Sequence, residues 1–277
     1  MQSPLRRVAS RLWIMLVLTP YRVLRRYGRQ LARQAGRRFA RYRKVWRRRA
    51  YQQWNKRNRR TYTERLELVP ARDELPELLN RRGLTRTGAE IGVKAGKFSA
   101  WLLTEWKGSR LISIDPWLED APDAYVDTAN VPQDQHERFY EETKARLAPF
   151  GKRSEIWRLT SVDAAAQVAD GSLDFAYIDA RHDYESVLED LEAWFPKVRA
   201  GGIFAGHDYA TGHFPQGDFG VKKAVDEFFA ARSIPVHATD GRYPVEMFPT
   251  WIVEIPASAS PAGDSAASSR EGAAATG

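Results

Sequence analysis

The chain has 277 residues, of which 43 are Lys or Arg and 35 are Asp or Glu, so its formal net charge is +8. It contains no cysteine, which excludes disulfide bonds, thiolate metal sites and cysteine nucleophiles and fits a reducing cytoplasm. The charge is uneven, because residues 1–60 hold 20 of the basic side chains and no acid. The other 217 residues carry a balance of −12, so the pI near 9.7 describes neither part.

Residues 1–60 predict a basic amphipathic helical arm. The apolar run "LWIMLVL" at 12–18 is too short to cross a bilayer, which takes about 20 residues, and no signal-peptide cleavage site follows it. After it, apolar residues recur every three or four positions, at Leu24, Tyr27, Leu31, Ala35, Phe39, Tyr42 and Trp46. Such a helix suits an anionic membrane surface, RNA or an acidic protein. Alternatively, it is a solvated extension that packs on its own domain or on a second copy.

Residues 61–256 predict one α/β domain. Apolar runs predict strands at 88–93, 110–115, 154–159, 173–179, 201–208 and 251–255, and helical patterns fall at 73–83, 98–106, 134–151, 184–198 and 221–231. This alternation predicts a mostly parallel sheet with helices on both faces. Residues 257–277 are mostly Ala, Ser and Gly and predict a disordered tail.

The first candidate site is "EIGVKAGKFS", where Gly92 and Gly96 follow a predicted strand and precede a helix. Glycines there let a ligand approach the backbone and the helix N-terminus. Asp115 ends the next strand and is placed to accept hydrogen bonds from ribose hydroxyls. The glycines do not form the GxGxxG pattern of a pyrophosphate site, and the preceding Glu90 favours a cationic or zwitterionic nucleoside. The alternative is an ordinary tight turn with a capping Asp.

The second candidate site lies where two further strands end. Asp179 ends one strand, and His207 and Asp208 end the next, so the three should meet at the carboxyl edge of a parallel sheet. Two carboxylates with an imidazole or water suit Mg²⁺ or a similar dication. His182, three residues after Asp179, is a candidate general base. Asp183 is interpreted as a helix cap, and His207 as either a ligand or a packed imidazole.

These stretches resemble a known enzyme class. "AEIGVKAGKFS", "LISIDPW", "LDFAYIDARHDYESVLEDLEAWFPKVRAGGIFAGHDY" and "GVKKAVDEFF" are similar to class I S-adenosylmethionine-dependent methyltransferases, in the branch that contains the metal-dependent macrocin-type sugar O-methyltransferases. The resemblance covers residues 75–255. It implies a Rossmann-like, mostly parallel seven-stranded sheet and methyl transfer from S-adenosylmethionine to a hydroxyl.

The resemblance also implies residue roles. Glu90, Gly92 and Gly96 would hold the methionine end of the cofactor, Asp115 the ribose, and Ser161 and Asp163 would lie near the adenine. Asp179 and Asp208 would be metal ligands and His182 the base. Relatives in the metal-dependent branch tend to have an acid where this chain has His207, which leaves the third ligand open. Arg181 receives no role.

The expected function is therefore O-methylation of a sugar or another polar small molecule by a cytoplasmic enzyme that uses a divalent metal, with Mg²⁺ as the expected ion. The arm would allow association with the cytoplasmic face of a membrane and action on a lipid-linked glycan, or formation of a homo-oligomer. The alternatives are a nucleic-acid methyltransferase that uses the arm as a phosphate-binding hook, and a non-enzymatic interaction protein on a methyltransferase fold. The glycine pattern disfavours a nicotinamide-dependent oxidoreductase.

Overall fold

The computed structural model describes residues 66, 69, 71–121, 125–239 and 248–257. The predicted arm, and the predicted tail beyond Ala257, lie outside these residues. No helix in the described part of the chain has the length and apolar character needed to span a bilayer.

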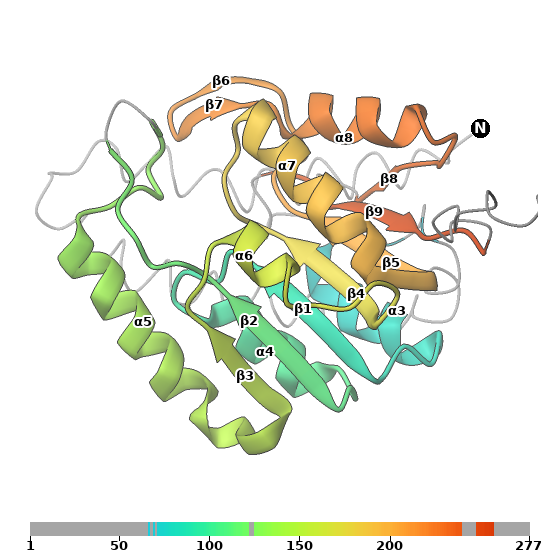
Figure 1. Ribbon diagram of the computed structural model, residues 1–277, viewed down its shortest axis with the longest axis horizontal. Coiled ribbons are helices and arrows are strands. Elements are labelled where there is room, and N and C mark those ends of the chain that lie inside the picture. The colour runs from blue at the N-terminus through green and yellow to red at the C-terminus, as the bar shows by residue number, and fades with distance from the viewer. Residues whose placement is uncertain (1–65, 67–68, 70, 122–124, 240–247, 258–277) are drawn as a thin grey trace, which may run out of the picture. The chain divides into compact units, whose positions relative to one another are not determined.

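The centre of the domain is a seven-stranded sheet with the order β3-β2-β1-β4-β5-β9-β8 (Figure 1). Strands β1 to β5 pair in parallel, and β9 is antiparallel to both of its neighbours, β5 and β8. The strands are β1 (Thr87–Ile91), β2 (Arg110–Ile114), β3 (Ser154–Trp157), β4 (Leu173–Ile178), β5 (Val198–Gly206), β8 (His237–Ala238) and β9 (Trp251–Glu254). The predicted mostly parallel, seven-stranded Rossmann-like sheet is confirmed.

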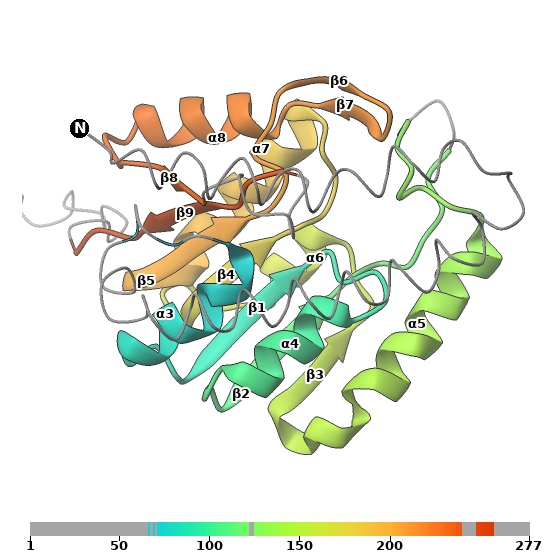
Figure 2. The same cartoon turned by 180° about the vertical axis from the view of Figure 1, so that it is seen from behind.

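Helices cover both faces of this sheet, as predicted. Helices α6, α7 and α8 lie over one face, while α3 and α4 lie over the other with α5 beside α4 (Figures 1 and 2). Their bounds are α3 (Leu75–Arg81), α4 (Lys97–Glu105), α5 (Gln133–Leu147), α6 (Ser161–Ala165), α7 (Tyr184–Trp194) and α8 (Val221–Ala230), with 3₁₀ turns at Arg72–Glu74, Ala148–Arg153 and Phe195–Lys197. Each face has its own hydrophobic core.

Helix α7 shows how local sequence places the site. All six residues of β4 are buried, which fits a central strand between two helical layers. The chain then leaves the sheet, and the Asp183 carboxylate accepts the backbone N–H of Ser186 at 3.0 Å, which confirms the predicted cap of α7. Val187, Leu191 and Trp194 recur at helical spacing and are buried against the sheet. Residues 179–183 are thereby fixed at the carboxyl edge.

Three short features were not predicted. These elements are only two to five residues long, which is too short to show a periodic pattern. They are the hairpin of β6 (Gly212–Phe214) and β7 (Gly217–Phe219), the edge strand β8 and the helix α6.

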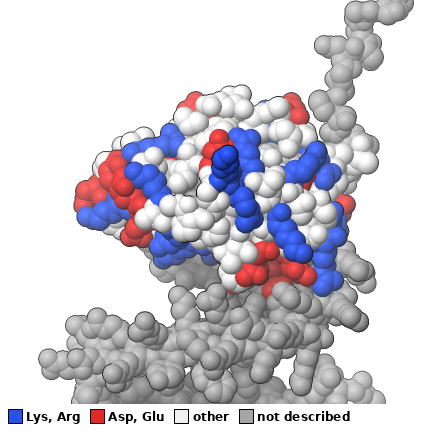
Figure 3. All heavy atoms as spheres, turned by 90° about the horizontal axis from the view of Figure 1, so that it is seen from below, with Lys and Arg blue, Asp and Glu red and all other residues white. Residues whose placement is uncertain are grey.

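The face of the domain seen in Figure 3 carries basic and acidic side chains interspersed with one another.

Candidate functional site

A cavity of about 900 Å³ opens at the carboxyl ends of β1, β2, β4 and β5. This is the edge at which ligands bind in open parallel sheets. The predicted site residues that line it are Glu90, Gly92, Asp115, Ser161, Asp179, His182, His207 and Asp208. Gly96 and Asp163 are not among its lining residues.

The glycine turn depends on the absence of side chains. Gly92 has φ 88°, and a β-carbon there would lie 2.0 Å from the carbonyl oxygen of Asp179. Gly96 has φ 66° as the N-cap of α4, and a β-carbon there would lie 3.0 Å from the Thr143 side chain. The turn therefore brings the end of β1 into contact with the end of β4 and leaves the N-terminus of α4 close to the cavity.

Glu90 is a buried carboxyl in the wall of this cavity. The Ser99 hydroxyl donates a hydrogen bond to it, and the Ser113 hydroxyl lies 3.1 Å from that of Ser99. Burial raises the pKa of Glu90 to about 8, since desolvation disfavours the ionised form. A cationic group that enters the cavity would stabilise the ionised carboxylate, so Glu90 is suited to an ammonium ligand.

Asp115 organises the turn from the end of β2. Its carboxylate accepts the backbone N–H groups of Val93 at 2.9 Å, Lys94 at 2.7 Å and Trp117 at 2.7 Å. A carboxylate has about four acceptor positions, so these three bonds leave room for about one more partner. The capping role raised as the alternative therefore accounts for most of its hydrogen bonds, and a ribose hydroxyl could use the last position.

The two residues expected near the adenine have different surroundings. Ser161 lines the cavity, and its hydroxyl accepts Trp194 Nε1–H at 2.8 Å and also bonds to Asp190. Asp163 instead accepts the Thr160 hydroxyl at 2.7 Å, while its own backbone N–H donates to Thr160 Oγ1 at 3.2 Å. Its carboxylate is thus engaged by the Thr160 N-cap of α6 and does not line the cavity, and a place near the adenine stays a prediction for Asp163.

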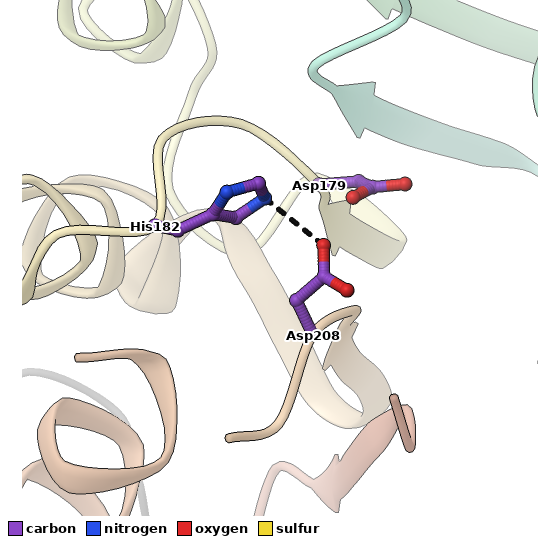
Figure 4. A group of neighbouring side chains, drawn as sticks. All are labelled: Asp179, His182 and Asp208. Atoms are coloured by element: carbon purple, nitrogen blue, oxygen red, sulfur yellow. Dashed lines mark ion pairs between the residues drawn. The ribbon is translucent and has the colours of Figure 1, made fainter. Parts of the chain in front are cut away.

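The second cluster brings Asp179, His182 and Asp208 together (Figure 4). One potential ligand atom from each lies within 4.8 Å of the others, and His182 Nε2 is 2.9 Å from Asp208 Oδ2. His207 joins from the end of β5, with its Nδ1 3.0 Å from Asp208 Oδ1 and 3.7 Å from Asp179 Oδ1. The Nε2 atom of His207 is buried with no hydrogen-bond partner among the described residues. Carboxylate oxygens and imidazole nitrogens therefore lie close together at the carboxyl ends of β4 and β5, as the strand order predicts.

The charges in this cluster stabilise one another. Burial lowers the pKa of His182, but hydrogen bonds to Asp127 and Asp208 outweigh burial and raise that pKa to about 10. Burial raises the pKa of Asp208, yet hydrogen bonds from His182 and His207 outweigh burial and hold this pKa well below the usual range. The carboxylates of Asp127 and Asp208, which hold its two ring nitrogens, thus favour the protonated form of His182.

Asp127 is a residue of this cluster that was not predicted. Its Oδ2 lies 2.8 Å from His182 Nδ1, and its side chain is 2% exposed. The segment that carries it forms an antiparallel bridge with Gly217, whose β-carbon would lie 2.6 Å from the carbonyl oxygen of Val126. The Phe219 ring stacks on His182 with centroids 4.3 Å apart. Asp127 lies 55 residues from His182 in a segment without periodicity, so no sequence pattern indicates the contact.

Two arginines complete the rim. Arg181, which had no predicted role, donates to the Asp183 carboxylate at 3.0 Å, and its guanidinium carbon lies 4.3 Å from the Tyr125 ring centroid. It thereby connects the start of α7 to the segment between β2 and α5.

The second arginine is Arg72, whose Nη1 donates to Asp179 Oδ2 at 3.2 Å. Arg72 was not predicted as a site residue, because it lies before residue 75, where the family resemblance begins.

Part of the chain is similar to known proteins. Residues 89–209 match the family model described as "Methyltransferase domain". The chain is 31% identical over 134 residues to the uncharacterized protein y4gI of Sinorhizobium fredii, an alignment that covers 48% of this chain and 14% of that relative. The chain thus spans about one seventh of the length of the curated relative it matches.

Several solved structures align with this chain at low sequence identity. The O-methyltransferase TomG from Streptomyces achromogenes, solved with S-adenosylmethionine, is 19% identical with a TM-score of 0.46, and the alignment covers 66% of this chain and 79% of TomG. An O-methyltransferase from Bacillus cereus, solved with SAH, is 16% identical with a TM-score of 0.46 at the same coverage. A putative O-methyltransferase from Klebsiella pneumoniae is 15% identical with a TM-score of 0.47, covering 71% of this chain and 90% of that one.

Proposed function

We propose that the protein is an S-adenosylmethionine-dependent methyltransferase that methylates a hydroxyl of a sugar or another polar small molecule, a proposal supported by the match of residues 89–209 to a methyltransferase family model. The observation that carries the proposal is the joining of two half-sites in one cavity. The buried Glu90 and the glycine turn line one part of it, and the Asp179, His182 and Asp208 cluster lines another.

The first half-site suits the donor. Glu90 would accept the ammonium group of the methionine moiety, because an entering cation would offset the effect of burial, which disfavours the ionised carboxylate. The N-terminus of α4, beside Gly96, would receive the carboxylate. Asp115 would offer its remaining acceptor position to the ribose, and Ser161 would lie towards the adenine. Holding the sulfonium in place is a large part of catalysis, since the methyl group is already activated.

The second half-site fits a divalent cation such as Mg²⁺. Asp179 and Asp208 supply hard carboxylate oxygens, an imidazole lies within the same 4.8 Å, and the buried His207 Nε2 has no partner among the described residues. When bound, such an ion would lower the pKa of an acceptor hydroxyl. Asp179 and Asp208 would hold it, with His207 as the candidate third ligand.

His182 would take the proton that the acceptor hydroxyl loses as its oxygen bonds to the methyl carbon and the carbon–sulfur bond breaks. Asp127 holds Nδ1 of the ring, so Nε2 is the nitrogen directed to the cluster. Of the two carboxylates that raise the pKa of His182, Asp208 is the one shared with the candidate cation site. Engagement of Asp208 elsewhere would lower that pKa and favour proton acceptance at Nε2.

The proposal is tested on the full chain with three alanine variants. Asp179→Ala and His182→Ala should lose methyl transfer to a panel of sugars in the presence of Mg²⁺, while S-adenosylhomocysteine still binds in calorimetry. His237→Ala, on the edge strand β8 and not among the cavity-lining residues, should keep both properties. Undiminished turnover in His182→Ala would remove its role as the base. Absence of S-adenosylhomocysteine binding in the unaltered chain would favour a non-enzymatic interaction protein.

The basic arm supports a separate proposal about partners. Residues 1–60 carry 20 basic side chains and no acid, so they would draw the enzyme to an anionic membrane surface or an acidic partner. Co-sedimentation with anionic vesicles, lost when residues 1–60 are deleted, is the expected result. If substrate affinity instead fell steeply with salt and depended on the arm, the acceptor would be a nucleic acid.

A further inference from the structure

Arg72 stands where the two half-sites meet. It begins the 3₁₀ turn Arg72–Glu74, and its Nη1 lies 3.2 Å from Asp179 Oδ2, a candidate metal ligand. Its guanidinium carbon lies 5.1 Å from the ring centroid of Phe98, the second residue of α4. The same side chain therefore contacts a carboxylate of the cation half-site and the first turn of the helix at the donor half-site.

The charge of Arg72 acts on both half-sites. It lowers the pKa of Glu90, although burial dominates there. The ion pair with Asp179 is only partly shielded, with side-chain exposures of 29% and 24%. Such pairs contribute little free energy, so this partnership can be exchanged for a better one.

We propose that Arg72 couples donor binding to cation binding. Arg72 pairs with Asp179 in this structure, and once the donor is bound it pairs with the donor's α-carboxylate instead. The donor's α-carboxylate can accept a bidentate pair of hydrogen bonds from a guanidinium group, which is stronger than the one hydrogen bond that Arg72 donates to Asp179. Asp179 is then released to the cation, which would otherwise be repelled by the guanidinium. This inference rests on the proposed function, because the coupling requires a donor with an amino-acid end.

The test measures Mn²⁺ affinity of the full chain by electron paramagnetic resonance, so no acceptor is needed. In the unaltered protein, S-adenosylhomocysteine should tighten Mn²⁺ binding by about 5- to 10-fold, a usual size for coupling between sites. 5′-Methylthioadenosine, which lacks the amino-acid group, should leave Mn²⁺ binding unchanged. By reciprocity, Mn²⁺ should tighten S-adenosylhomocysteine binding by the same factor.

Arg72→Gln should separate the two events. Mn²⁺ alone should bind about 3- to 10-fold more tightly, because a competing cation has been removed from Asp179. S-Adenosylhomocysteine should then add less than about 2-fold. The matched control is Arg110→Gln, which removes the same charge from an exposed pair with Glu155 and should behave as the unaltered protein.

Two results would overturn the coupling: Mn²⁺ affinity unchanged in Arg72→Gln, or full coupling that persists in that variant. Either result, with S-adenosylhomocysteine still bound, would leave the proposed function intact. Failure of the unaltered chain to bind S-adenosylhomocysteine at all would instead overturn the proposed function together with the coupling.

Discussion

The buried carboxyl of Glu90 makes the stability of the domain depend on pH. Its pKa is about 8 in the folded chain against an ordinary value of 4.5, and the cause is burial. Between these values the folded chain holds a proton that the unfolded chain has lost, so stability is greatest at low pH and falls as the pH rises from about 5 to 8. Each pH unit well inside this window costs about 1.4 kcal/mol.

Replacing the acid by its neutral analogue removes this dependence. From pH 5 to pH 7 Glu90 alone should cost the unaltered protein about 2.5 kcal/mol, whereas Glu90→Gln should lose nothing from this position. The amide oxygen can still accept the hydrogen bond from Ser99, so the comparison isolates ionisation. Urea unfolding followed by tryptophan fluorescence at pH 5, 6 and 7 provides the measurement, since the chain has nine tryptophans.

The exposed Glu105→Gln serves as the control and should follow the unaltered protein at every pH. Other titrating groups of the site are present in all three proteins, so their contributions cancel in the comparison. If the stabilities of the Glu90→Gln variant and the unaltered protein changed in parallel between pH 5 and 7, the reasoning from burial would be refuted.

Three further outcomes are expected. Asp127→Asn, which removes the negative charge beside Nδ1 of His182, should lower kcat about 10- to 100-fold. The affinity for S-adenosylhomocysteine, measured by calorimetry, should stay unchanged. An unchanged kcat would show that Asp127 does not position His182. Gly217→Ala would place a β-carbon 2.6 Å from the Val126 carbonyl oxygen, whereas at Gly171 no atom lies within 4 Å of the added β-carbon. In urea unfolding, Gly217→Ala should therefore lower the free energy of unfolding by about 1–3 kcal/mol more than Gly171→Ala. Equal losses in the two variants would contradict the close contact. Burial raises the pKa of Asp190 to about 7, so Asp190→Asn should reduce the loss of unfolding free energy between pH 5 and 7 by about 2 kcal/mol. An unchanged pH dependence of the unfolding free energy would argue against a buried neutral acid at residue 190.

Much of the fold is predictable because buried parallel strands are continuous apolar runs. The β4 segment shows this directly, since all its residues are buried and its position follows from composition alone. The convergence of Asp179 with Asp208 also follows, because adjacent parallel strands end at one edge. Pairs of residues that depend only on strand order are therefore accessible from sequence.

Contacts made by irregular segments are not accessible in this way. Asp127 reaches His182 only because its segment pairs with the hairpin at Gly217, and neither segment has a period that fixes its position. Arg72 meets Asp179 across 107 positions of the chain from a three-residue turn. Asp163 shows a local effect, because the Thr160 cap of α6 competes for its carboxylate.

The contact between Gly92 and Asp179 limits how this domain can evolve. A β-carbon at residue 92 would lie 2.0 Å from the carbonyl oxygen of Asp179, whose own N–H donates to the Ile91 carbonyl at 2.7 Å. Any side chain selected at residue 92 for its effect on the donor would therefore displace the backbone of a candidate metal ligand. A library screen that measured only cation binding would therefore identify residue 92 as part of the cation site, although it lines the donor half-site. Substitutions in the two half-sites must consequently occur together.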